Sequence, residues 1–159
     1  IPAFEHDGFQ LYESTAIARY IDAAFDGPRL QPGEPRPQAR MNQALNVLDS
    51  YGYRTLVWDV FVERVRAPAT GRASDEARIA AALPRAATCL AALTEIGGGG
   101  PFLAGAALTL ADLHAAPMLV YFRLAPEGAA IIARHPRIAA WLDMMAARPS
   151  LAATRSPLE

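Results

Sequence analysis

The sequence has few residues that carry redox or metal chemistry. Cys89 is the single cysteine among 159 residues, so no disulfide can form within the chain, and we expect a reducing, cytoplasmic setting. Cys89 lies in an apolar helical pattern, which favours a buried, unreactive thiol over a nucleophile. His6, His114 and His135 are far apart and lack the spacing of metal ligands, so we expect no metal site.

The sequence also lacks a block of like charge and a long apolar run. It carries 15 basic and 16 acidic residues, neither of them clustered, so we expect no nucleic-acid partner. The longest uncharged run, residues 96–111, is rich in glycine and shorter than the roughly 18 apolar residues of a membrane span, so we expect no membrane association. With 52% hydrophobic residues the chain can bury a sizeable core.

A β-hairpin is predicted at the beginning of the sequence. Residues 3–5 and 9–12 are short, partly apolar runs. The Asp7-Gly8 pair between them is favoured where a tight turn needs positive φ. Two antiparallel strands are therefore expected here.

The hairpin is followed by a helix whose first residues suggest a binding site. Glu13-Ser14 precedes apolar residues at helical spacing, and Ser14 is expected to cap a helix that ends at residues 26–28. The unpaired N–H groups and the positive dipole end of such a helix favour a carboxylate, and Glu13 adds an acceptor for an amine. The two residues together suit the zwitterionic end of an amino acid or a γ-glutamyl group. The alternative is that Ser14 is only a cap and Glu13 only an acid in the first turn.

The rest of the sequence predicts a linker and a set of helices. Residues 27–37 are rich in proline and read as an extended linker, and residues 38–159 look helical throughout. A long helix is expected from about Pro37, and residues 74–76 and 97–100 mark the start and the end of the next one. On the long helix, one set of residues recurs at alternating steps of four and three and is expected to form a stripe along one face: Ala44, Leu48, Tyr51, Thr55, Trp58, Val62 and Val65.

A capping box is predicted before the central helix. Thr109 is placed to accept from the backbone N–H of Asp112, and the Asp112 carboxylate is placed to reach back to Thr109. The helix over residues 109–124 is apolar on most sides, so we expect it to be the buried centre of the helical part.

Three segments in order resemble the cytosolic glutathione S-transferase family. Residues 13–21 read E-S-x-A-I-x-x-Y-I, residues 102–112 read F-L-A-G-x-x-L-T-x-A-D, and residues 136–150 look like the family's late helix with a tryptophan packed inside. The likeness extends from the first residue to about residue 150. It implies a mainly α fold, with residues 1–26 as the last hairpin and helix of a thioredoxin-like domain, residues 27–37 as the linker, and residues 38–159 as an all-helical bundle.

The resemblance also implies a glutathione site at the beginning of the chain. The Ile1-Pro2 bond is expected to be cis, with the Ile1 backbone pairing with the cysteinyl part of glutathione. Glu13 and Ser14 are expected to hold its γ-glutamyl end. The implied reaction is conjugation of the glutathione thiolate to a small hydrophobic electrophile, as in detoxification, by a homodimer. Alternatives are a glutathione-dependent isomerase, dehalogenase or reductase, or a transferase-like interaction module without turnover.

The catalytic residue is unknown from this sequence. In the family, the group that activates the thiol lies in the first βαβ unit, which needs roughly 30 or more residues, and we expect that unit upstream in a longer protein. The family's electrophile pocket lies between the two domains, with Tyr51, Arg54 and Trp58 as candidates on the long helix. The alternative is that Tyr51 and Trp58 face the core and that Arg54 is simply exposed to solvent.

Overall fold

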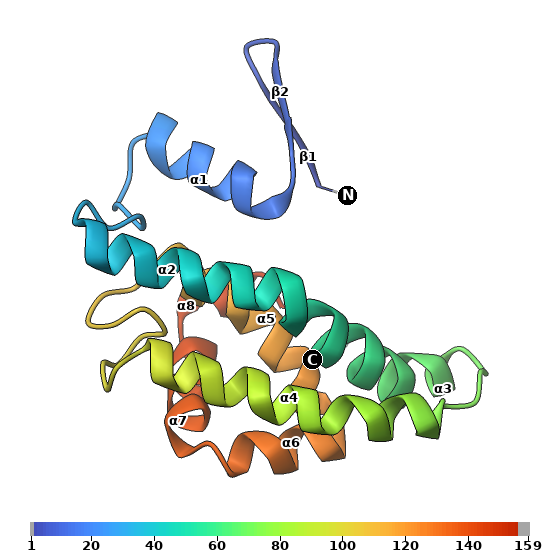
Figure 1. Cartoon of the computed structure of the whole chain (residues 1–159). Helices are drawn as coiled ribbons and strands as arrows, with labels where there is room; N and C mark the ends of the chain where they lie inside the picture. Colours follow the sequence, from blue (N-terminus) through green and yellow to red (C-terminus); the bar gives the residue numbers. More distant parts are fainter. Residues whose placement is uncertain (1, 156–159) are drawn as a thin grey trace.

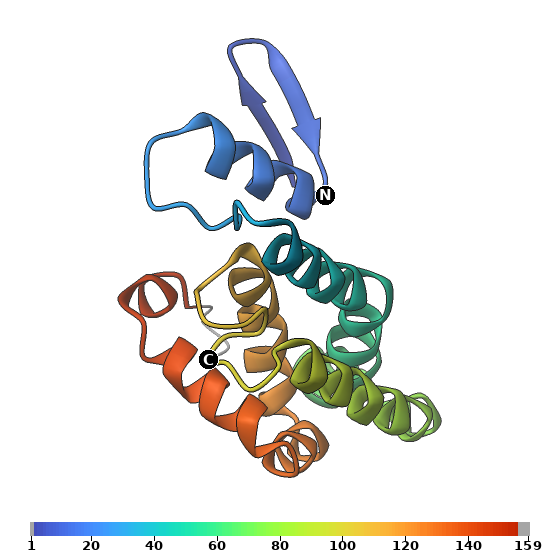
Figure 2. The same cartoon turned by 60° about the vertical axis from the view of Figure 1, so that its left-hand side comes forward.

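The computed structural model describes residues 2–155, and it places a hairpin and a short helix above a bundle of helices (Figures 1 and 2). Strand β1 (Ala3–His6) pairs antiparallel with β2 (Phe9–Tyr12), with Ala3 opposite Tyr12 and His6 opposite Phe9. The turn residues Asp7 and Gly8 have φ values of 50° and 82°. Two residues with positive φ form the turn type that matches the twist of a hairpin, so the predicted hairpin is confirmed.

Helix α1 (Ser14–Ala24) packs against the hairpin mainly through aromatic side chains. The Tyr20 ring lies edge-on to Phe4, with 5.9 Å between the ring centroids, and the Tyr20 hydroxyl is 2.9 Å from His6 Nδ1. No residue of α1 is fully buried. Helix and hairpin therefore form a small unit with much apolar surface exposed.

The linker is fixed at Leu30 and Gln31, which bond to α1 on one side and to the bundle on the other. The Asp22 carboxylate of α1 accepts hydrogen bonds from the backbone N–H groups of Leu30 and Gln31, at 2.7 and 3.1 Å. Burial of Asp22 opposes its ionisation, but these hydrogen bonds outweigh it and hold the pKa of that carboxyl below its usual value. The Leu30 carbonyl then accepts from the N–H of Leu110, 3.3 Å away, which attaches the linker to the bundle.

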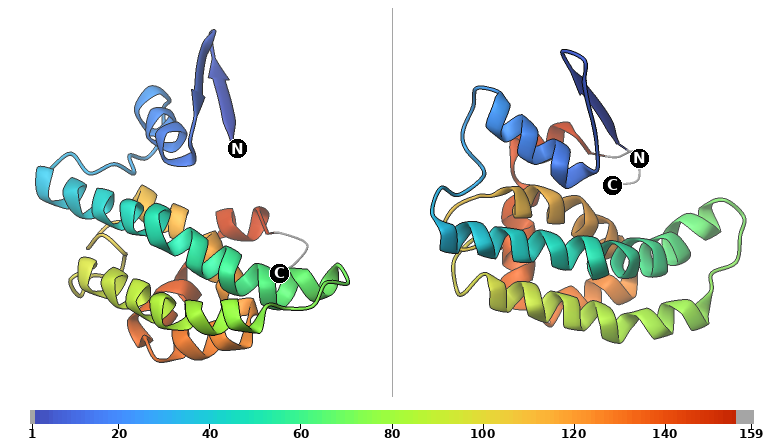
Figure 3. Two further views of the ribbon diagram at one scale, coloured as in Figure 1. Left: turned by 45° about the vertical axis from the view of Figure 1, so that its right-hand side comes forward. Right: turned by 45° about the horizontal axis from the view of Figure 1, so that its top comes forward.

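The long helix after the linker has two parts. Helix α2 (Pro35–Val47) begins two residues before the expected Pro37, with Pro35 in the first turn, where its missing N–H costs nothing. It continues without a break into the π-helical segment η1 (Leu48–Arg66), and both lie along the length of the bundle (Figure 3).

The π-helical winding of η1 changes which side chains face the core. At its end the N–H of Ala67 donates to the carbonyl of Val62, five residues back. An apolar stripe spaced for an α-helix then drifts around the helix. Tyr51 is 66% exposed and Trp58 is 45% exposed. The alternative that these two residues face the core is therefore wrong.

Within residues 2–155, six further helices complete the bundle, and α5 lies at its centre. They are α3 (Ala67–Ala69), α4 (Glu76–Ile96), α5 (Leu110–Leu124), α6 (Pro126–Ala133), α7 (Pro136–Ala146) and α8 (Pro149–Ala153). Helix α5 buries Leu119 and Phe122 completely and contacts α2, η1, α6 and α7. The mainly α fold and the buried central helix agree with the sequence prediction.

Arg137 of α7 fixes the glycine-rich turn that ends α4. One terminal nitrogen of its guanidinium, Nη2, donates to the carbonyls of Gly100 and Phe102, at 2.8 and 2.7 Å. A side chain at Gly97 would overlap this guanidinium. The run at residues 97–100 therefore ends α4 and binds the Arg137 side chain.

Helix α4 is long and apolar enough to cross a membrane, judged by length and composition alone, and α5 with α6, bent by 118°, passes the same test. However, Ile79, Leu90 and Leu93 of α4 are buried within the bundle. A core helix of a soluble protein meets the same criterion, so this is weak evidence for a span.

Candidate functional site

The first candidate site is the N-terminal end of α1. Glu13 precedes the helix with φ 74° and ψ 122°, a left-handed conformation that is strained for a residue other than glycine. Its carbonyl accepts the first helical hydrogen bond, from the N–H of Ile17 at 2.9 Å. The N–H groups of the first turn, including those of Ser14 and Thr15, precede this bond and are free to bind a ligand.

Ser14 is not the cap that the sequence suggested. The helix begins at Ser14 itself and Glu13 occupies the cap position, without a hydrogen bond from its side chain. Both residues are exposed. Within residues 2–155, neither the Glu13 carboxylate nor the Ser14 hydroxyl has a hydrogen-bond partner, so both groups are available to a ligand.

A small cavity lies beneath this end, between α1 and the helical bundle. Its volume is about 210 Å³, and Ser14, Leu45 of α2 and His114 of α5 are among its lining residues. His114 Nε2 is 2.7 Å from the Asp49 carboxylate of η1. The pair joins η1 to α5 beside the Ser14 end.

Trp58 lies on the exposed surface of η1 with a second aromatic residue. Its ring packs edge-on against Tyr53, with 6.5 Å between the ring centroids and an angle of 90° between the planes. Tyr53 and Trp58 are five residues apart, and residues at this spacing share a face of a π-helix. Asp49 lies about one turn before Tyr53. Tyr53 was not among the candidates predicted from the sequence, because an α-helix would place it away from Trp58.

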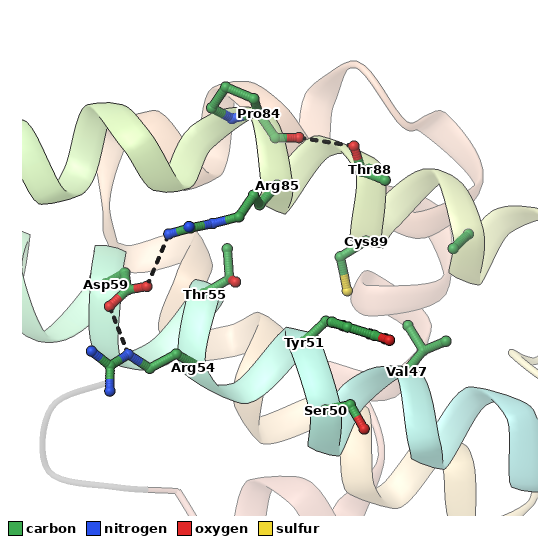
Figure 4. A pocket seen from close by; sticks show the side chains of 11 residues that line it. Val47, Ser50, Tyr51, Arg54, Thr55, Asp59, Pro84, Arg85, Thr88 and Cys89 are labelled. Carbon is green, nitrogen blue, oxygen red and sulfur yellow. Dashed lines mark hydrogen bonds and ion pairs between the residues drawn. The ribbon is translucent and has the colours of Figure 1, made fainter.

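Tyr51 and Arg54 line a different, larger cavity, between η1 and α4 (Figure 4). Its volume is about 740 Å³, within the usual range for small-molecule sites. Pro84, Arg85 and Thr88 of α4 form the opposite wall. Trp58 is not among the lining residues, and none of the described residues lines both this cavity and the one beside Ser14.

A buried carboxylate links the two walls of the larger cavity. The side chain of Asp59 is only 6% exposed, and its Oδ1 accepts from Nε of Arg54 at 3.0 Å and from Nε of Arg78 at 2.7 Å. Asp59 Oδ2 accepts from Nη2 of Arg85 at 3.3 Å. Three arginines therefore surround one carboxylate, and two of them, Arg54 and Arg85, face the cavity.

A second buried carboxylate, Glu63, continues this network away from the cavity. It pairs with Arg72 at 2.8 Å and with Arg78 at 3.0 Å, and it also accepts from the N–H of Asp75. The hydrogen bond from Arg72 is the largest cause of a lowered Glu63 pKa, although burial acts against it.

Cys89 lies in the wall of the larger cavity and is nearly buried. Burial raises the pKa of its thiol to about 11, so almost no thiolate is present at neutral pH. The prediction that this thiol is buried is confirmed, and its raised pKa agrees with low reactivity. Among residues 2–155, no three histidine, cysteine, aspartate or glutamate side chains gather as metal ligands would.

The predicted capping box is present, and Asp112 also accepts hydrogen bonds from residues outside the box. Its Oδ2 accepts from the Thr109 backbone N–H at 2.9 Å and from the Thr109 hydroxyl at 3.1 Å. Its Oδ1 accepts from the Leu103 N–H and from the Trp141 indole N–H, both at 2.8 Å. The fully buried carboxylate thus joins the 101–109 loop, α5 and α7, which is a structural role and not a catalytic one.

Part of the predicted glutathione site lies outside residues 2–155. Glu13 and Ser14 lie side by side at the end of α1, and Pro2 precedes β1 as an exposed residue. Ile1 and its bond to Pro2 lie outside the described residues. The role of these four residues stays a prediction, as does substrate binding by Tyr51, Arg54 and Trp58.

Comparison with known proteins agrees with this architecture. The family models for the N-terminal and C-terminal domains of glutathione S-transferases match residues 1–23 and 76–143. A glutathione S-transferase of Arabidopsis thaliana is 28% identical over 154 residues, covering 94% of this chain and 60% of the relative. Another from Hyoscyamus muticus is 28% identical over 152 residues, covering 94% of this chain and 71% of that relative.

A solved structure extends the comparison to three dimensions. Glutathione S-transferase III in its apo form superposes with a TM-score of 0.85 at 29% identity, over 97% of this chain and 71% of that one. The chain thus spans about two thirds of the length of the proteins that it matches. Matches to both domains, in the order that the structure shows, establish that the chain belongs to the cytosolic glutathione S-transferase family.

Proposed function

We propose that this chain is part of a transferase that conjugates the thiolate of glutathione to a small hydrophobic electrophile, in the cytoplasm. The observation that carries the proposal is the start of α1. There the side chains of Glu13 and Ser14, which have no hydrogen-bond partner among residues 2–155, lie beside N–H groups that have no helical partner.

The geometry supports a division of roles at this end. The γ-glutamyl carboxylate would accept hydrogen bonds from the Ser14 hydroxyl and from the first N–H groups of α1, where the helix dipole favours negative charge. Glu13 would accept from the γ-glutamyl amine, and the Ile1 backbone beside Pro2 would pair with the cysteinyl part. The positive φ of Glu13 turns the chain from β2 into the helix, so the strain at this residue positions the site.

Isothermal titration with glutathione tests the binding site. Removal of one hydrogen bond to a charged group costs about 1.5 kcal/mol or more, so Ser14→Ala should weaken glutathione binding by roughly tenfold. Ser150→Ala, an exposed serine in α8, is the matched control and should bind as the parent does. Equal binding by Ser14→Ala and the parent would contradict the assignment.

We place the electrophile over the aromatic pair of Tyr53 and Trp58. Asp49 lies about one turn before this pair and holds His114, which lines the cavity beside Ser14. Two exposed aromatic rings suit a small apolar substrate. Tyr51 and Arg54, the other two candidates, stand in a cavity that shares no lining residue with the Ser14 end.

Steady-state kinetics of the intact enzyme separate these two placements. With an activated aryl chloride as the electrophile, Trp58→Ala should raise its KM several-fold and leave the KM for glutathione unchanged. Tyr51→Ala is the matched control and should change neither value. The reverse result would move the electrophile to the cavity between η1 and α4.

We further propose that the intact protein is a homodimer built around α1 and the long helix. Helix α1 has no buried residue, and its Ile21 and the following Phe25 are each 41% exposed. A symmetric interface would cover such surface. Light scattering of the intact protein should give twice the monomer mass, and Ile21→Asp should shift it toward the monomer.

A further inference from the structure

Glutathione and the electrophile are proposed to bind on different parts of the chain, so their reaction depends on how these parts are placed. Glu13 and Ser14 lie at the start of α1, which packs on the hairpin, whereas Tyr53 and Trp58 belong to η1 of the bundle. We propose, on the basis of that function, that Asp22 of α1 is a positioning residue for the conjugation, because it holds α1 in a fixed orientation over the bundle.

The Asp22 carboxylate holds the linker against the last turns of α1. Its Oδ1 accepts from the Leu30 N–H at 2.7 Å, and its Oδ2 accepts from the backbone N–H and from Nε2 of Gln31, both at 3.1 Å. The same Nε2 also donates to the Arg19 carbonyl, 3.1 Å away. The Arg29 guanidinium donates to the backbone carbonyl of Asp22. Three donors from two consecutive linker residues thus meet on one carboxylate.

Leu30 continues this connection into the bundle. Its carbonyl accepts from the N–H of Leu110, the first residue of α5, at 3.3 Å, and its side chain packs against the bundle core. Leu110 also lines the cavity beside Ser14. Asp22 is therefore connected, through one linker residue, to the part of the bundle that lies under the end of α1 proposed to bind glutathione.

Helix α1 is held to the bundle by its second half. Among the described residues, the side chains of α1 make one direct hydrogen bond to the bundle, from Nη2 of Arg19 to Oδ1 of Asn42 in α2, at 2.6 Å. Arg19 lies one turn before Asp22, so both connections lie on the same part of the helix. The Ser14 end extends over its cavity without such a bond.

This arrangement makes the position of Ser14 sensitive to small rotations of α1. Ser14 precedes Asp22 by eight residues, which is roughly 12 Å along a helix. A rotation of about 5° at the Asp22 end would therefore move Ser14 by about 1 Å. The hairpin would move with it, because Tyr20 packs on Phe4. A misplacement of about 1 Å can lower a reaction rate roughly 100-fold.

Single-turnover kinetics of the intact enzyme test this role, because they measure the chemical step without product release. With saturating glutathione and an activated aryl chloride, Asp22→Ala should lower the single-turnover rate roughly tenfold or more. The Kd for glutathione should stay unchanged, because Glu13 and Ser14 keep their places in α1. Asp26→Ala removes an exposed aspartate that has no hydrogen bond among the described residues, so this matched control should keep the parent rate.

Hydrogen exchange of single amides separates a change of placement from a general loss of stability. In Asp22→Ala the Leu110 N–H should exchange faster, because its acceptor on Leu30 is no longer held. The N–H of Leu119, in the middle of the same helix, should keep its protection. Asp22→Asn keeps one acceptor for Leu30 but presents a donor to the two donors of Gln31, so it should give intermediate values. If Asp22→Ala fails to fold, Asp22→Asn carries the same test.

The outcomes distinguish the role of Asp22 from the function on which it depends. An unchanged single-turnover rate, in an enzyme whose parent form conjugates glutathione, would overturn the role of Asp22 alone. So would equal acceleration of exchange at Leu110 and Leu119, because Asp22 would then only stabilise the fold. A parent protein that binds no glutathione would contradict the proposed function, and the role of Asp22 with it.

Discussion

Replacing Asp112 with alanine should destabilise the helical bundle severely. The substitution leaves three buried donors without an acceptor: the backbone N–H groups of Leu103 and Thr109 and the indole N–H of Trp141. Each unsatisfied buried donor costs about 1–3 kcal/mol, so the loss should be about 3–9 kcal/mol. The total free energy of unfolding of a domain of this kind is about 5–15 kcal/mol. Asp112→Ala should therefore be marginally folded or unfolded.

Urea unfolding followed by circular dichroism measures this loss. Trp141→Phe is the informative comparison, because it removes the indole N–H together with one of the bonds and leaves the other donors of Leu103 and Thr109 paired. It should cost about 1–2 kcal/mol. The loss of stability in Asp112→Asn should fall between those of Asp112→Ala and Trp141→Phe. The asparagine amide group would present a donor, and not an acceptor, to the Thr109 N–H. The reasoning fails if Asp112→Ala costs less than Trp141→Phe.

Two further changes follow from packing and charge. Gly128→Ala should cost about 3 kcal/mol or more in urea unfolding, because its Cβ would overlap the Phe122 carbonyl oxygen, whereas Gly33→Ala, with open space around it, should change stability by less than about 0.5 kcal/mol. A Gly128→Ala variant as stable as Gly33→Ala would contradict this. Because Arg72 lowers the folded pKa of Glu63, that carboxylate stabilises the fold above its unfolded pKa of about 4.3, and the contribution is lost as pH falls through the lower folded value. Glu63→Gln should thus flatten the fall in Tm below about pH 4.5, and an unchanged profile would argue against the Glu63–Arg72 pair.

Features that depend on neighbouring residues could be predicted from the sequence. The Asp7-Gly8 turn and the capping box of Thr109 and Asp112 are each decided within a few residues, and the structure contains both. The alternation of helices and breaks follows from proline and glycine. The family resemblance then supplied what local patterns do not, namely which helix end is a candidate for binding glutathione.

Features that depend on winding and distant partners could not be predicted. The stripe that contains Tyr51 and Trp58 was read with α-helical spacing, and the π-helical winding of η1 turns both residues outward onto different faces. Arg85 lies 26 residues from Asp59, and no local pattern connects them. The Trp141 indole, which also donates to Asp112, lies 29 residues away from it. For Ser14 the error was a single position, since the helix begins one residue earlier than a serine cap requires.

The contact between Gly97 and Arg137 has a consequence for how this fold can vary. A side chain at position 97 and a guanidinium from position 137 would compete for the same space. The Gly100 carbonyl accepts from that guanidinium, and the Phe102 carbonyl accepts from it as well as from the Gly105 N–H. The two positions are therefore free to change only together: among related chains, a residue larger than glycine at 97 should be accompanied by the loss of arginine at 137. The costs of substituting them one at a time should add up to more than the cost of substituting both.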